Sequence, residues 1–199
     1  MVLNSDRTVA LAPFASVDRS ALRWLRTSEN PVEFTLLSDN LEVAKIRWGP
    51  QGGSLASVST SDALWTLKRG GFLNPHITLR RAGGGENLAR LSVHLSSHRI
   101  EVLGGNTYRF HRAGMLVPAW KVATGDGKEV LHMEPVREGR KLVAGAAIPA
   151  PAAVDLPDLL MLVVMGWYFI VLAWFEDEAL VPLEGPEAGT SRESAESAH

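Results

Sequence analysis

The feature that most constrains the fold is a stretch of seventeen residues, 159–175, that contains no charged side chain. Asp155 and Asp158 before it can cap a helix and complement its positive end, and Pro157 suits a first turn, so we predict a helix over 157–176. A helix that is apolar on every side lies either in a membrane or at the centre of a core. At ~1.5 Å per residue the segment extends about 25 Å, which fits a core and is close to the lower limit for a bilayer.

The flanks of this segment differ from those of a membrane span. The nearest basic residues are Lys141 and Arg192, so the segment has neither a positive-inside signal nor a lysine that could snorkel. Trp167 and Tyr168 lie in its middle rather than at its two ends. We therefore favour a buried helix. The alternative is a tail-anchored membrane protein with a single transmembrane helix over 159–175 and a soluble β domain before it.

From Pro31 onward, short runs of alternating apolar and polar residues are separated by turn residues, which is typical of an antiparallel β domain. Glycines at 83–85, 104–105 and 127 supply the positive φ angles that tight turns need. The predicted strands are 32–37, 41–48, 54–60, 64–69, 76–80, 88–95, 99–103, 107–112, 116–123, 129–134 and 141–148. Closure removes the exposed edges of so long a meander, so we predict a mostly β fold with a closed antiparallel barrel. A barrel of this size is too wide for its wall side chains to fill, and a central helix can fill it.

The two ends of the chain carry different signals. Residues 16–27 place apolar side chains among charged ones at roughly helical spacing, which predicts a short helix in an N-terminal extension over 1–30. Residues 1–20 contain no apolar stretch of signal-peptide length, so we expect no secretion by that route. Residues 184–199 contain no large apolar side chain, which predicts a disordered acidic tail. The barrel domain is therefore expected over 31–183.

Three stretches share features with a known family: the first two each place a tryptophan on a predicted strand, and the third contains a Gly-Trp-Tyr sequence inside the apolar helix. They are LWTLKRGGFLNPHITLRR, TYRFHRAGMLVPAWKVATGDGKEVL and LPDLLMLVVMGWYFIVLAWF. This pattern of Trp65, Trp120 and the Gly-Trp-Tyr helix resembles that of the tubby-like superfamily, in its small LURP-one-related and phospholipid-scramblase-like members. The likeness covers roughly residues 31–178.

Proteins of that superfamily resemble one another in a barrel of twelve antiparallel strands closed around a hydrophobic C-terminal helix. The resemblance therefore implies that Gly166, Trp167 and Tyr168 belong to a structural core helix. Glycine inside a helix costs about 1 kcal/mol relative to alanine, so Gly166 also indicates a strand packed closely against it. Phospholipid scramblases are associated with an acidic calcium-binding segment before the terminal helix, where this chain has Arg137 and Arg140. The resemblance thus does not extend to calcium dependence or scrambling.

Residues typical of catalysis and metal binding do not form a recognisable pattern. The chain has no cysteine, which excludes disulfides and thiolate ligands. His94 and His98 would lie ~13 Å apart on a strand, too far to share a metal, and are predicted to be surface residues. Ser54 lacks the flanking pattern of a nucleophile elbow. We expect a non-enzymatic protein with no metal and no cofactor.

Charge is distributed unevenly along the chain. Residues 1–150 carry 19 Lys and Arg against 13 Asp and Glu, whereas residues 151–199 carry one Arg against nine acids. The total of -2 with 21% charged residues is that of an ordinary globular protein, so we expect no nucleic-acid partner. We expect the protein in the cytoplasm, where it could also contact the membrane peripherally.

Arginines are the candidates for ligand binding. Strand alternation around the turn at 83–85 is expected to bring Arg80, Arg81 and Arg90 to one end of a hairpin, where guanidinium groups could hold a phosphate. Tubby domains are known to bind phosphoinositide head groups through basic side chains on the barrel. The sequence therefore predicts a barrel that binds anionic phospholipid or phosphoinositide-like head groups, or a protein partner, through its exterior.

Overall fold

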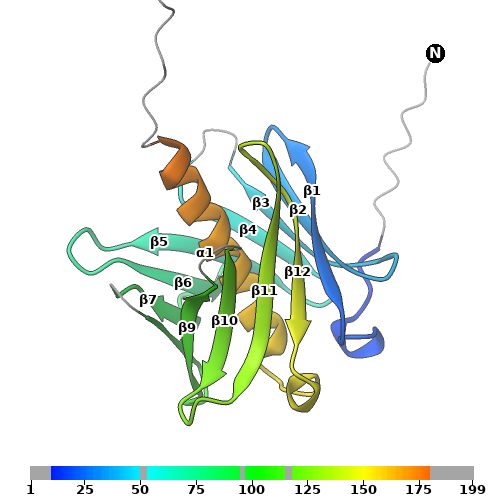
Figure 1. Ribbon diagram of the computed structural model, residues 1–199, viewed down its shortest axis with the longest axis vertical. Coiled ribbons are helices and arrows are strands. Elements are labelled where there is room, and N and C mark those ends of the chain that lie inside the picture. Colours follow the sequence, from blue (N-terminus) through cyan, green and yellow to red (C-terminus); the bar gives the residue numbers. More distant parts are fainter. Residues whose placement is uncertain (1–9, 50–52, 95–96, 115–117, 180–199) are drawn as a thin grey trace, which may run out of the picture.

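The computed structural model describes residues 10–49, 53–94, 97–114 and 118–179. Twelve antiparallel strands form a closed barrel in which each strand pairs with its neighbours along the chain and β1 pairs with β12 (Figure 1). The strands are β1 Leu22–Glu29, β2 Val32–Ser38, β3 Leu41–Trp48, β4 Leu55–Thr60, β5 Leu64–Gly70, β6 His76–Arg81, β7 Asn87–Ser92, β8 His98–Val102, β9 Thr107–Ala113, β10 Ala119–Thr124, β11 Glu129–Glu138 and β12 Lys141–Pro149. The predicted closed barrel is confirmed. The predicted tail, residues 184–199, lies outside the described residues.

The prediction of a helix over 16–27 is wrong. The chain makes one 3-10 turn, η1 (Phe14–Ser16), and then enters β1, so the barrel begins at Leu22 rather than at residue 31. Leu22 and Trp24 are two positions apart, the spacing that places side chains on one face of a strand, and both are buried inside the barrel. Pairing of β1 with β2 and β12 outweighs the weak helical pattern of this short segment.

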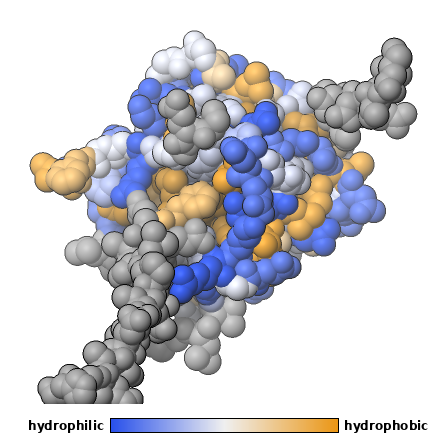
Figure 2. Space-filling view, turned by 90° about the horizontal axis from the view of Figure 1, so that it is seen from above, coloured by the Kyte–Doolittle hydropathy of each residue, from blue (hydrophilic) through white to orange (hydrophobic). Residues whose placement is uncertain are grey.

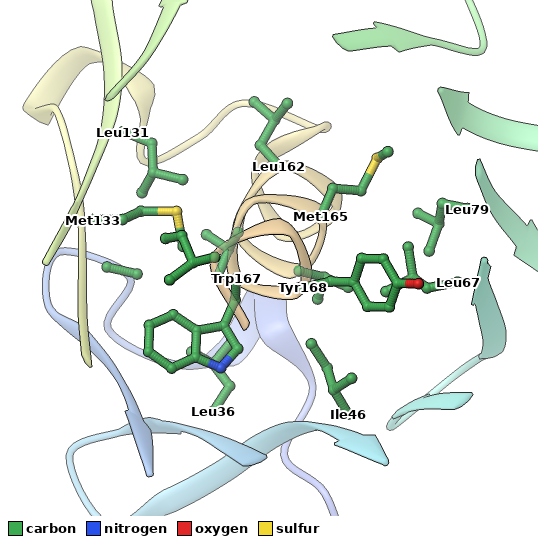
Figure 3. Packing of buried hydrophobic residues seen from close by; sticks show 14 of the residues in the cluster. Leu36, Ile46, Leu67, Leu79, Leu131, Met133, Leu162, Met165, Trp167 and Tyr168 are labelled. Carbon is green, nitrogen blue, oxygen red and sulfur yellow. The ribbon is translucent and has the colours of Figure 1, made fainter. Parts of the chain in front are cut away.

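The apolar segment forms α1 (Leu159–Ala179), which follows a 3-10 turn, η2 (Pro151–Ala153), and runs through the barrel interior (Figure 1). Figure 3 shows side chains of the surrounding strands pointing at α1 from opposite sides, Met133 on one side and Leu79 on the other. Its residues from Leu162 to Tyr168 are all buried, Gly166, Trp167 and Tyr168 among them. The helix therefore supplies the centre of the core. In the described part of the chain, no helix is both long enough and apolar enough to cross a membrane.

Aromatic stacking holds α1 in register with the wall. Trp167 stacks on Trp24 of β1, with ring centroids 5.7 Å apart and an interplanar angle of 8°. Tyr168 stacks on Trp48 of β3 at 5.6 Å and 4°. The Tyr168 hydroxyl donates a hydrogen bond to the carbonyl of Ser54, and burial raises the pKa of this phenol. Offset aromatic pairs contribute about 0.5–1.5 kcal/mol each beyond the area they bury.

Two glycines allow this close approach. Gly145 of β12 lies opposite Trp24, and a Cβ at this position would overlap the Trp167 ring and lie 3.0 Å from the Glu134 carbonyl oxygen. A Cβ on Gly166 of α1 would lie 2.7 Å from Sδ of Met133 on β11. The close strand that Gly166 indicated is therefore β11, and the tighter of the two contacts is at Gly145.

We expect Gly145→Ala to lower the free energy of unfolding by about 1–3 kcal/mol, since neither the indole nor the strand backbone can move aside cheaply. Gly166→Leu should also destabilise by about 1–3 kcal/mol, because Met133 can move aside for a methyl group but not for an isobutyl group. Urea denaturation measures both. Gly85→Ala is the control, since a Cβ there meets open space. Wild-type stability of Gly145→Ala would contradict this packing.

The start of α1 is fixed by a buried carboxylate. Asp158, 7% exposed, accepts hydrogen bonds from Nδ2 of Asn106 at 2.8 Å and from the Tyr108 hydroxyl at 2.9 Å. Burial, together with the hydrogen bond and charge of Asp158, raises the pKa of Tyr108 to about 12. Asp155 does not cap the helix; it pairs with Arg19 at 2.7 Å. Asp158 thus ties the helix start to β9.

The tyrosine of this contact predicts an alkaline effect. In the unfolded chain Tyr108 ionises near pH 10, but in the folded protein only near pH 12, so its contribution to stability is complete below pH ~10 and is lost as pH rises to about 12. Tyr108→Phe should be less stable than wild type at neutral pH by about 1–3 kcal/mol, and the difference should shrink above pH ~10. Urea denaturation across this range measures it. Parallel pH profiles for the two proteins would contradict the assignment.

Candidate functional site

The structure separates the three predicted arginines. Arg80 of β6 and Arg90 of β7 are both exposed on the outer wall, and Nε of Arg80 donates to Oδ1 of Asn87 at 2.7 Å. Arg90 lies opposite Thr78, two residues from Arg80, so the two arginines are diagonal neighbours. Arg81 falls on the other side of its strand, where it lines a hollow at the barrel rim. Arg80 and Arg90 thus stay together and Arg81 does not join them.

Further basic residues extend this pair across the wall. Strand alternation and register place exposed side chains of β5 to β9 on the same outer surface. We call this surface the outer basic face; its members are Lys68, Arg80, Arg90, Arg99 and Arg109. Within the described strands of this face the acidic residue is Glu101, which lies opposite Arg90 and pairs with Nε of Arg99 at 3.1 Å. The face therefore has a net positive charge.

An apolar hairpin tip lies beside the outer basic face. Phe72 is 99% exposed and Leu73 86% exposed in the connection between β5 and β6. This hairpin projects from the barrel at the left of Figure 1, and Figure 2 shows an isolated hydrophobic projection on the same side. We call these two residues the hairpin tip. Transfer of a large apolar side chain from water to an apolar environment is favourable by about 1.5–3 kcal/mol, and Phe72 and Leu73 do not gain this free energy in the isolated protein.

The backbone on either side holds the hairpin tip in place. Gly71 has a φ of 77°, in the left-handed region that favours glycine, and a Cβ there would overlap the Asn74 carbonyl. A ring nitrogen of His76 donates to that carbonyl at 3.0 Å, and the Val93 amide donates to the Pro75 carbonyl at 3.0 Å. The tight turn keeps Phe72 and Leu73 pointing away from the barrel.

Sequence reasoning missed the hairpin tip and misplaced one histidine. A Phe-Leu pair between two glycines and Asn-Pro was the available signal, because apolar residues in a turn have no strand face to join. His98, predicted to be a surface residue, is half-buried, with its ring 4.6 Å from that of Phe169. Burial, with a smaller contribution from His94, lowers the pKa of His98.

Comparisons with protein-family models, with curated proteins and with solved structures find no match for this chain. The candidate site is therefore defined by its own geometry: a basic outer wall with an apolar projection at the end of two of its strands.

Proposed function

We propose that this protein is a non-enzymatic barrel of the tubby-like kind that binds reversibly to anionic lipid bilayers. The observation that carries the proposal is the exposure of Phe72 and Leu73 at a tip whose two strands, β5 and β6, also carry Lys68 and Arg80 of the outer basic face. Basic side chains attract the anionic head groups, and the tip enters the apolar layer beneath them. The tubby-like resemblance of the sequence supports the same assignment.

Simple magnitudes favour a bilayer over a protein partner. Each basic residue near an anionic surface contributes about 1 kcal/mol, and each apolar side chain of the tip about 1.5–3 kcal/mol on insertion. Together these contributions are enough for peripheral binding to an anionic bilayer. Specific protein interfaces bury about 800 Å² on each partner around an apolar centre, and a two-residue projection is small for that purpose.

Co-sedimentation with vesicles tests the proposal. The full chain should sediment with phosphatidylcholine vesicles that contain phosphatidylserine, and less so with phosphatidylcholine alone or at higher ionic strength. Arg80→Glu with Arg90→Glu should weaken binding at least about tenfold, and Phe72→Ser with Leu73→Ser should do the same. Arg81→Glu is the matched control, because Arg81 lies off the face; it should bind like wild type.

Each component of the proposal can fail separately. Equal sedimentation of wild type and the Arg80, Arg90 variant would refute the role of the outer basic face. Equal sedimentation of wild type and the Phe72, Leu73 variant would refute insertion of the tip. No binding of wild type to phosphatidylserine vesicles at low ionic strength would overturn the proposal as a whole and leave a protein as the partner to seek.

A further inference from the structure

A concave surface lies at the end of the barrel where α1 ends. It is a groove of about 480 Å³ between the inner side of β9 to β11 and the last turns of α1. Its polar lining comes from Arg112, Arg137 and Arg140, and its apolar lining includes Trp120, Ile170 and Trp174. We call it the arginine-tryptophan groove. Figure 2, which looks at the barrel from above, shows hydrophobic residues in the middle bordered by hydrophilic ones.

The strands place these side chains by continuing past the packed core. On β9, Tyr108 and Phe110 are buried, and Arg112 is the next residue on the same side of the strand. Arg112 lies directly opposite Trp120 of β10, so the two side chains share the inner surface. The wall that is apolar around α1 therefore becomes basic at its rim.

Aromatic contacts make the groove a fixed surface. Trp120 stacks on Phe110, with ring centroids 5.0 Å apart, and also meets Phe169 edge-on at a centroid distance of 5.1 Å. Nε1 of Trp174 donates to the carbonyl of Arg140 at 2.9 Å, a contact between residues 34 positions apart. Both indoles are half-buried, and the exposed part of Trp120 offers apolar surface to a ligand.

The arginines are available to an anion. Cζ of Arg137 lies 4.4 Å from the centroid of the Trp174 ring, an arrangement that orients a guanidinium while leaving its N–H groups free to donate. Among the described residues, Arg112, Arg137 and Arg140 have no ion-pair partner, and the groove lining contains no acidic side chain. Three positive charges therefore face a partly apolar space.

We propose that the arginine-tryptophan groove binds an amphiphilic anion, a carboxylate or phosphate carried on an apolar body. The guanidinium groups hold the head, and Trp120, Trp174 and Ile170 cover the body. A volume of about 480 Å³ is within the ~300–1,000 Å³ usual for small-molecule sites. This site is separate from the outer basic face, so it does not rest on binding to a bilayer.

Isothermal titration calorimetry of the full chain tests the groove. Dodecyl phosphate and dodecanoate, each below the concentration at which micelles form, should bind with one site per chain. Inorganic phosphate lacks the apolar body and dodecyl maltoside lacks the charge, so each should bind at least about tenfold more weakly. If inorganic phosphate bound as tightly as dodecyl phosphate, the proposed contact with the apolar body would be overturned. If dodecyl maltoside bound as tightly as dodecyl phosphate, the role of the arginines would be overturned.

Variants locate the binding. Arg112→Gln with Arg137→Gln should weaken dodecyl phosphate binding at least about tenfold, whereas Arg80→Gln with Arg90→Gln, on the outer basic face, should leave it unchanged. Arg137→Lys, with Arg112 unchanged, retains the charge and should bind dodecyl phosphate more tightly than the double variant does. A thermal melt of each variant shows that it is folded. Wild-type affinity in the groove variant, or equal losses in the two double variants, would refute the assignment.

Discussion

The structure depends on the contact of Trp167 with Trp24 across Gly145. A closed barrel of twelve strands has more interior than its wall side chains can fill, and the indole of α1 reaches the wall only because Gly145 has no side chain in its way. This contact fixes α1 against β1 and β12, the two strands that close the barrel. We therefore expect packing of the helix and closure of the wall to be cooperative, so that neither α1 nor the barrel is stable without the other.

Because α1 fills the interior, both proposed sites lie on the surfaces that remain. The outward-facing side chains of the strands do not pack in the core, and from β5 to β9 they include basic residues. Where α1 ends, the inner surface of β9 to β11 extends beyond the packed core and becomes the arginine-tryptophan groove. Both proposed sites thus consist of strand side chains that do not pack in the core: those on the outer face of the wall, and those on its inner face beyond the packed layer around α1.

Much of this architecture could be predicted from the sequence, because alternation and turn glycines are local signals. The strands after residue 31 and the central helix follow from them. The sequence did not predict β1, because its apolar spacing is compatible with a short helix and the segment becomes a strand through its pairing with β12. Arg81 was misplaced because β6 continues one residue beyond its predicted end. The groove could not be predicted, since the meeting of Arg137 with Trp174 depends on how the helix emerges from the barrel.

Hydrogen exchange of the backbone amides of α1 in the full chain, measured without detergent, tests the central claim most directly. If α1 is the centre of the core, the amides from Leu162 to Val171 open only when the whole barrel unfolds, and their opening free energy equals that of the most protected amides of β1 and β12. Gly145→Ala should lower all three together. Exchange of α1 at a lower free energy than the strands, unaffected by Gly145→Ala, would show that the barrel is stable without its helix.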